Sequence, residues 1–196
     1  MAVTSSTILS TKYGNFMVNY HKFSKGYCIS LTYGDIKETN ILVRIQSSCL
    51  FSEAFHAIDC DCNLQLSTSL KTISKVGSGV VVYSYEEGRG VGLENKIRAM
   101  ELERTKGIDT VEAFEELSFS TDPRTHSNAI RALTDLGISN QIRLITNNPN
   151  LIRAVSKSGF VVNRYDIKYP ISERIKKYLR VKKEKLGYLI SDDMVR

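Results

Sequence analysis

The sequence predicts an α/β (α+β) fold in a single domain, with a β-rich first part followed by strands and helices that alternate around a mixed sheet. Three observations lead to this prediction. The chain has 196 residues, a length that favours one domain. Its composition, 42% hydrophobic and 24% charged, is ordinary for a globular protein. Runs of β-branched residues alternate with runs of helical spacing along most of the chain, as in sheets covered by helices.

The first third of the chain is rich in the β-branched and aromatic residues that favour strands. We expect strands at residues 27–32 and 41–45, with Gly34 and Asp35 forming a turn between them. The spacing of Leu66, Leu70 and Ile73 then predicts a helix over residues 64–76.

The later elements are predicted by the same two patterns, and several of the helices are closed by a glycine. Asp122 is the expected N-cap of one helix, with Pro123 at its first position. In chain order we expect a strand at 79–85, a glycine-rich loop at 87–92, helices at 93–106 and 124–136, a strand at 142–145, a helix ending at 158, a strand at 160–162 and a basic helix at about 171–187.

The charge and the termini limit the function classes. The formal net charge is +6, which suits a polyanionic partner such as a nucleotide or a nucleic acid, although the basic helix near the end is expected to be a solvated face. No run of apolar residues is long enough to span a membrane. Residues 1–12 lack the features of a secretory signal, so we expect a cytoplasmic protein with reduced thiols.

Three of the four cysteines form a C-x10-C-x-C pattern, namely Cys49, Cys60 and Cys62. Three thiolates without a fourth protein ligand suit a catalytic zinc site, in which water takes the open position. Cys28 is the remaining candidate for a fourth ligand, but it lies far away in sequence. The pattern is not a standard zinc-finger spacing, so the spacing alone leaves three buried, inert thiols as the other interpretation.

Three further segments carry weaker signals. The loop at 86–92 follows a strand and precedes a helix, so its amides could bind an anion, and Arg89 could bind phosphate through two donors. The pair Asp122 and Arg124 could serve phosphate chemistry at a helix start. The TNNP turn at 146–149 follows a strand end, where ligands bind in α/β sheets.

Together, these segments resemble the GTP cyclohydrolase II family in order and near-spacing, and the resemblance covers nearly the whole chain. The start of the chain, at 13–16 and 33–36, and its end, at 182–189, also resemble that family. The motifs are RIQSSC at 44–49, DCDCNLQL at 59–66, EGRGVGLENKIRA at 87–99, DTVEA at 109–113 and TNNP at 146–149.

The resemblance implies a zinc-dependent enzyme that opens the imidazole ring of GTP. Cys49, Cys60 and Cys62 would hold the zinc, and Arg124 would attack the α-phosphate and displace pyrophosphate, with Asp122 as the proton acceptor. The products would be formate and a diaminopyrimidinone ribosyl phosphate on the way to riboflavin. Mg²⁺ would assist at the phosphates, and the protein would be a homodimer. The implied nucleotide contacts are Arg44, Ser47, Gln65, Glu87, Gly88, Arg89, Thr110 and Thr146.

Four positions depart from the family pattern. Gln46 stands where a His is usual, Ser48 where a Glu is usual, Met100 where a Tyr is usual and Leu151 where a Lys is usual. A thioether cannot replace the proton donor of a phenol, so ring opening could stop at the formamide. Base recognition could also have changed, which would make another purine nucleotide the substrate.

Two other classes compete with an enzyme. A nucleotide-binding protein without catalysis is favoured by the four departures, but it has no use for the three cysteines, Asp122 and Arg124. A nucleic-acid-binding domain is suggested by the charge and the basic helix. It is disfavoured because no helix-turn-helix is evident and basic residues do not interleave with aromatic ones as in proteins that bind single strands.

Overall fold

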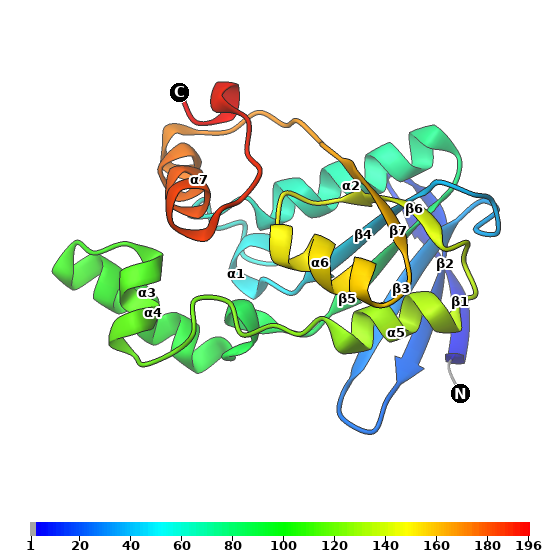
Figure 1. Cartoon of the computed structure of the whole chain (residues 1–196), viewed down its shortest axis with the longest axis horizontal. Coiled ribbons are helices and arrows are strands. Elements are labelled where there is room, and N and C mark those ends of the chain that lie inside the picture. Colours follow the sequence, from blue (N-terminus) through cyan, green and yellow to red (C-terminus); the bar gives the residue numbers. More distant parts are fainter. Residues whose placement is uncertain (1–2) are drawn as a thin grey trace. The chain divides into compact units, whose positions relative to one another are not determined.

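The structure is a computed structural model that describes residues 3–196. Its elements, drawn in Figure 1, fall into strands and helices in the following order along the chain. The strands are β1 (Val3–Thr11), β2 (Gly14–Lys22), β3 (Tyr27–Tyr33), β4 (Ile41–Ser47), β5 (Gly79–Ser84), β6 (Gln141–Ile145) and β7 (Val161–Tyr165). The helices are α1 (Leu50–Glu53), α2 (Cys62–Val76), α3 (Leu93–Lys106), α4 (Thr110–Glu116), α5 (Ser127–Asp135), α6 (Pro149–Lys157) and α7 (Glu173–Leu186), with 3₁₀ turns η1 (Glu87–Gly90) and η2 (Asp192–Met194).

Within the described residues, the strands form one seven-stranded sheet in the order β1-β2-β3-β5-β4-β6-β7. The pairs β1–β2, β2–β3 and β3–β5 are antiparallel, whereas β4–β6 and β6–β7 are parallel. The sheet is therefore mixed, which confirms the predicted fold class. No helix in the described part of the chain is long and apolar enough to cross a membrane.

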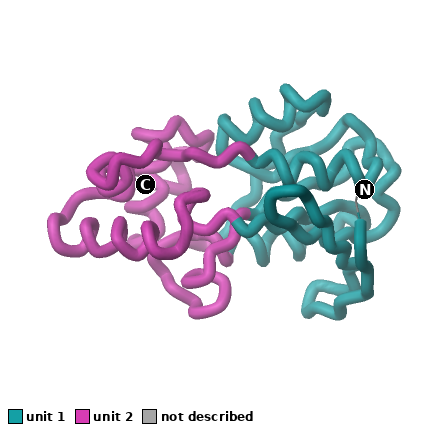
Figure 2. Tube along the Cα trace, turned by 90° about the horizontal axis from the view of Figure 1, so that it is seen from below, with its two compact units in different colours: residues 1–46, 64–85, 126–169 teal, residues 47–63, 86–125, 170–196 magenta. Residues whose placement is uncertain are grey.

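Contacts divide the chain into two compact units, each made of separate stretches of sequence (Figure 2). Unit 1 comprises residues 1–46, 64–85 and 126–169, and unit 2 comprises residues 47–63, 86–125 and 170–196. The single domain expected over residues 1–196 stays a prediction.

Unit 1 is a sheet with an apolar core on each face. On one face, alternate residues of β4 such as Ile41 and Val43 pack with Leu133 of α5 and Val155 of α6. On the other face, Leu42 lies with Ile73 of α2 in a second cluster. Successive side chains of a strand point to opposite faces, so one strand supplies both cores. This explains why the predicted strand at 41–45 is apolar at nearly every position.

At the start of the chain, the structure differs from the sequence prediction in two ways. The hairpin of β1 and β2 is not part of the sequence prediction, because β1 is an edge strand whose side chains are nearly all exposed and carry no burial pattern. The turn at Gly34 does not join neighbouring strands, because β5 lies between β3 and β4 in the sheet.

The helix start predicted at Asp122 is wrong. Helix α5 begins at Ser127, and its N-cap is His126 in the left-handed region at φ 56°. The carboxylate of Asp122 accepts hydrogen bonds from Arg124 instead of capping a helix. The carboxylate is charged in either role, but the guanidinium brings a second charge and two parallel donors, so the side-chain pair takes precedence.

Unit 2 is mostly helical and contains a small core of Ala99, Ala113 and Phe114. Helix α4, absent from the sequence prediction, begins with a capping box in which Asp109 and Glu112 bind each other's backbone amides. The basic helix predicted at about 171–187 is α7, which begins after the N-cap Ser172 and ends at Gly187 in the left-handed region.

Gly34 lies in the left-handed region at φ +64°, and a Cβ there would be 1.9 Å from the carbonyl oxygen of Gly77. Gly159 also has a positive φ, of +96°, but a Cβ there would meet nothing within 4 Å. The two glycines therefore separate the cost of backbone conformation from the cost of a steric clash.

We expect Gly34→Ala to lower the free energy of unfolding by about 2–5 kcal/mol, because a left-handed alanine and an overpacked backbone contact both cost energy. Gly159→Ala should lower it by only about 1–2 kcal/mol, since it has the conformational cost alone. Urea unfolding of both variants measures the difference. Equal losses would show that the approach of Gly34 to Gly77 is not a constraint.

Candidate metal centre and phosphate-binding residues

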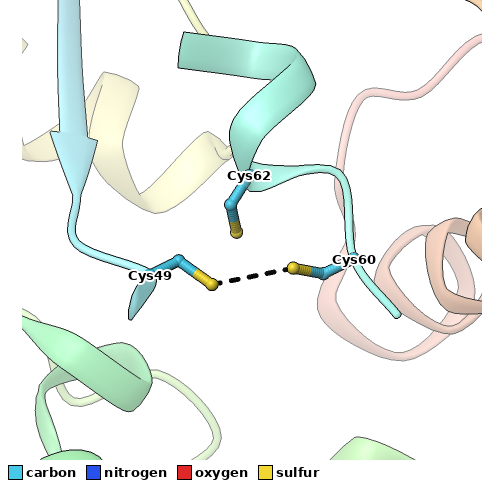
Figure 3. Close-up of side chains that lie close together, drawn as sticks. All are labelled: Cys49, Cys60 and Cys62. Atoms are coloured by element: carbon cyan, nitrogen blue, oxygen red, sulfur yellow. Dashed lines mark hydrogen bonds between the residues drawn. The ribbon is translucent and has the colours of Figure 1, made fainter. Parts of the chain in front are cut away.

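The three predicted cysteine ligands lie together in unit 2 (Figure 3). Cys49 follows β4 and precedes α1, while Cys62 is the first residue of α2 and Cys60 lies two residues before it. Their sulfur atoms all lie within 4.8 Å of one another, and the Sγ atoms of Cys49 and Cys60 are 3.7 Å apart. Tetrahedral zinc, with Zn–S bonds of about 2.3 Å, requires sulfur atoms about 3.8 Å apart. The distance between Cys49 and Cys60 matches this spacing, and the third sulfur atom lies within 4.8 Å of both.

Cys28 does not belong to this group. It is fully buried in β3 of unit 1, where its thiol donates to the carbonyl oxygen of Asn128 at 3.8 Å. Among the described residues, the metal-binding group consists of the three cysteines alone. A set of three protein ligands is typical of catalytic zinc sites, in which the fourth position is open.

The three thiols share protons unevenly. Hydrogen bonds from Cys60 and Cys62 stabilise the Cys49 thiolate and lower the pKa of Cys49 to about 2. The same hydrogen bonds to Cys49, together with burial, raise the pKa of Cys60 and of Cys62. The negative charge of the Cys49 thiolate thus disfavours deprotonation of the other two thiols. Since metal binding requires all three thiolates, this donor set calls for a cation.

Lys96 of α3 connects the cluster to the glycine-rich loop. Its ammonium group donates to Cys49 Sγ at 3.2 Å and to Glu87 Oε1 at 2.6 Å. The other oxygen of Glu87 accepts from the backbone amide of Leu50 at 2.8 Å. Burial disfavours the charged form of Lys96, but the bond to Glu87 and the charge of Cys49 outweigh it, so the pKa of Lys96 is raised.

Arg124 and Asp122 form a two-pronged ion pair in unit 2. Nε of Arg124 donates to Oδ1 of Asp122 at 2.7 Å, and Nη2 donates to Oδ2 at 2.8 Å. Nη1 donates to the hydroxyl of Ser47 at 3.1 Å, and Nη2 also reaches the hydroxyl of Tyr188 at 3.4 Å. The structure therefore brings together three of the predicted site residues and adds Tyr188.

Arg89 and Thr110, two predicted nucleotide contacts, also meet in unit 2. Arg89 lies in the left-handed region at φ 55°, next to Gly88 at φ 59°. Its guanidinium donates to Thr121 O at 3.2 Å and to the hydroxyl of Thr110 at 3.3 Å, and it lies 4.9 Å from the ring centroid of Phe114. A non-glycine residue in this conformation is costly, so the loop is shaped to place the guanidinium.

The remaining predicted contacts, Arg44, Gln65 and Thr146, lie in unit 1. Arg44 is only 8% exposed and donates to the side-chain oxygens of Gln46 and Gln65 and to the carbonyl oxygen of Ile145. The hydroxyl of Thr146 accepts from the amide of Asn148 at 3.0 Å. Gln46, where the family has His, thus holds Arg44 through one oxygen that accepts twice.

The other departures occupy different environments. Leu151 is 4% exposed and belongs to the apolar core of unit 1, so it packs rather than contacts a ligand. Met100 lies in α3 and is partly exposed, and Ser48 follows the end of β4.

Sequence reasoning missed Lys96, Tyr188 and Lys182. The expectation that the basic helix is a solvated face is wrong for Lys182, which is 7% exposed and donates to Asp61 Oδ1 at 3.2 Å. Burial alone would lower the pKa of Lys182, but Asp61 and the neighbouring tyrosines raise it. A signal existed, because Lys182 follows Ile175 and Leu179 at the spacing of a buried helix face.

Comparison with known proteins identifies close relatives. The sequence model described as GTP cyclohydrolase II matches residues 2–166. The chain is 40% identical over 197 residues to the GTP cyclohydrolase-2 of Buchnera aphidicola subsp. Acyrthosiphon pisum, covering 98% of this chain and 100% of that protein.

Two longer proteins are similarly related. The chain is 41% identical over 189 residues to the GTP cyclohydrolase-2 of Archaeoglobus fulgidus and 39% identical over 186 residues to the riboflavin biosynthesis protein RibBA of Endomicrobium trichonymphae. These matches cover 96% and 93% of this chain but only 50% and 46% of the relatives, so the chain spans about half their length. Among solved structures, the chain has a remote likeness to RibBX, a two-domain 3,4-dihydroxy-2-butanone 4-phosphate synthase from A. baumannii, with 16% identity and a TM-score of 0.49 over 85% of this chain and 40% of that one.

We expect Cys60→Ala to abolish tight zinc binding, because the metal would lose one of its three thiolate ligands. Cys28→Ala is the matched control, since it removes a buried thiol outside the cluster. After dialysis against trace zinc, elemental analysis should find about one zinc per chain in the native protein and the control, and almost none in Cys60→Ala. Equal zinc in both variants would contradict the assignment.

Proposed function

The chain belongs to the GTP cyclohydrolase II family, and from this premise we propose that it is a zinc-dependent hydrolase that opens the imidazole ring of GTP. The proposed products are pyrophosphate, formate and a diaminopyrimidinone ribosyl phosphate that is used in riboflavin biosynthesis. The convergence of the Cys49, Cys60 and Cys62 sulfur atoms within 4.8 Å carries this proposal.

Cys49, Cys60 and Cys62 would hold the zinc through their thiolates, and the 3.7 Å between the sulfur atoms of Cys49 and Cys60 supports this. When bound, zinc supplies Lewis-acid activation of water for attack on the ring carbon that lies between two nitrogens. Lys96 contributes a positive charge beside Cys49 and is itself held by Glu87, so the sulfur nearest to the glycine-rich loop is fixed in place.

Arg124 acts at the α-phosphate. In this step a guanidinium nitrogen forms a bond to phosphorus, the bond from phosphorus to the pyrophosphate oxygen breaks, and the proton of the attacking nitrogen passes to Asp122. The contacts of 2.7 and 2.8 Å between Arg124 and both oxygens of Asp122 support this role, because the acceptor already lies on the donor nitrogens. Water then cleaves the nitrogen–phosphorus bond and restores the guanidinium.

The glycine-rich loop and α4 bind the nucleotide phosphates. Arg89 is a half-buried cation whose donors face Thr110 and Thr121 O, and two consecutive left-handed residues shape its loop. Ser47, which accepts from Arg124, lies where it can fix the same phosphate. Arg44, Gln65 and Thr146 remain predicted contacts in unit 1, as do Glu87 and Gly88 in unit 2.

Three further features are proposed from the family resemblance. The protein is a homodimer, Mg²⁺ assists at the phosphates of GTP, and the reaction takes place in the cytoplasm without nucleic acid or a membrane. The positive formal charge of +6 supports a polyanionic nucleotide as the ligand.

A second candidate is ring opening that stops at the formamide. Met100 in α3 favours it, because this thioether replaces a phenol and has no proton to give to the amine that leaves when the formamide is hydrolysed. Ring opening and formamide hydrolysis both need attack by water, but the second attack also needs a proton for the amine.

We expect the zinc-loaded protein to consume GTP, and Asp122→Asn to slow that consumption about 100- to 10,000-fold, because the proton acceptor is lost. Asp192→Asn, which removes a carboxylate bound to Lys183 instead, is the matched control and should keep the native rate. Mass spectrometry of the nucleotides measures both. GTP left intact by the native protein would favour a nucleotide-binding protein without catalysis.

Formate release distinguishes complete turnover from the shorter reaction. If Met100 ends the reaction early, pyrophosphate will be released from GTP while formate stays below about one-tenth of an equivalent, because formamide hydrolysis lacks its proton donor. Met100→Tyr should then raise formate toward one equivalent. Stoichiometric formate from the native protein would rule out the early stop.

A further inference from the structure

Helix α7 lies outside the segment that the family model matches, since that match ends at residue 166 and α7 begins at Glu173. Nevertheless, α7 contacts the cysteine segment within unit 2. Arg174 near its start forms an ion pair with Asp59, and Lys182 near its end forms one with Asp61. The two acids stand on either side of Cys60, so α7 binds the segment that carries two of the three thiols.

The ion pair between Lys182 and Asp61 is deeply buried. The side chain of Lys182 is 9% exposed and that of Asp61 is 0% exposed, and Nζ lies 3.2 Å from Oδ1. The ammonium also lies 4.5 Å from the ring centroid of Tyr178 and 5.3 Å from that of Tyr188. Two aromatic faces and one carboxylate therefore surround this cation.

Such a pair is a poor device for stability alone, because removing two charges from water costs about as much as their attraction returns. An apolar residue would suit the position better, since Lys182 follows Ile175 and Leu179 on the buried face of α7. A lysine on that face is explained if its charge holds a carboxylate in place, which an apolar side chain could not do.

The carboxylate that Lys182 holds belongs to Asp61, whose backbone lies between two of the proposed metal ligands. Asp61 is the single residue between Cys60 and Cys62, so an immobile Asp61 side chain limits the positions that both thiols can take. The charges also match. Three thiolates around Zn²⁺ carry a net charge of −1, and the buried carboxylate of Asp61 adds another, which the ammonium of Lys182 offsets.

We infer that Lys182 is a positioning residue for the zinc site, which through its ion pair with Asp61 makes the zinc affinity of the cysteines depend on helix α7. The inference rests on the proposed zinc site. In this role Lys182 is not a metal ligand but holds Asp61, the residue between two of the ligands. Groups that orient metal ligands in this way typically change metal affinity about 10- to 100-fold when they are removed.

The test compares zinc dissociation constants, measured by competition with a chromophoric chelator, in the native full-length protein and its variants. Lys182→Met should weaken zinc binding about 10- to 100-fold, and Lys182→Arg should restore most of the affinity because it keeps the charge. Lys183→Met is the matched control, since Lys183 is the next residue of α7 and pairs with Asp192 rather than with the cysteine segment. It should leave the zinc affinity unchanged.

Lys182→Met removes the counterion of the buried Asp61 carboxylate, so the variant could fail to fold for that reason alone. The double variant Asp61→Asn, Lys182→Met removes both charges and keeps the test valid. If the pair positions the thiols, the double variant folds and still binds zinc more weakly than the native protein. Its cobalt complex should also show altered thiolate-to-metal absorption, which a purely structural role would not change.

Failure of this inference and failure of the proposed function give different results. Zinc affinity within about twofold of native in the folded double variant, with an unchanged cobalt spectrum, would overturn the inference, because removal of an orienting group changes metal affinity about tenfold or more. Absence of zinc binding by the native protein would instead overturn the proposed function, and the inference with it.

Discussion

The mutual approach of three thiols is the constraint on which the rest of this structure depends. Sulfur atoms within 4.8 Å of one another cannot all be thiolates without a compensating charge, and the lowered pKa of Cys49 beside the raised pKa of Cys60 and Cys62 expresses that conflict. A cation resolves it, and the chain builds its surroundings accordingly. Each flanking ammonium group is itself held by a carboxylate.

Three cations of unit 2 are each paired with an acid. Lys96 is bound to Glu87, Arg124 to Asp122 and Lys182 to Asp61. The carboxylates restrict these long side chains, which then hold their charges beside Cys49, at the proposed phosphate site and beside the segment of Cys60 and Cys62. Preorganised charge of this kind needs no rearrangement when an anionic ligand arrives.

The departures from the family pattern differ in what they change. Leu151 adds to the core of unit 1, and Gln46 preserves the hold on Arg44 by accepting two hydrogen bonds. Both are accommodated by packing or by hydrogen bonding. Met100 is different, since no rearrangement gives a thioether a proton to donate. Of the proposed reaction, the step after ring opening is therefore the one in which this chain has most room to differ from its relatives.

The sequence by itself determined the elements whose pattern is local. The apolar run at 41–45 predicted a strand and the helical spacing at 64–76 predicted a helix, because burial and spacing are written along the chain. The three-cysteine pattern indicated candidate zinc ligands, although its spacing alone left inert thiols as the other interpretation. The exposed edge strand β1 carried no burial pattern and was missed. Helix α4 was missed although its capping box, Asp109 and Glu112, can be read from the sequence.

Only the tertiary structure decided which side chains meet. Asp122 looked like a helix cap and proved to be the partner of Arg124, and Lys182 looked like part of a solvated face and proved to be buried against Asp61, 121 residues away in sequence. A helix cap and an ion pair use the same carboxylate, and the choice between them depends on which donor the fold brings within reach. That proximity arises from the packing of distant segments, which no local pattern records.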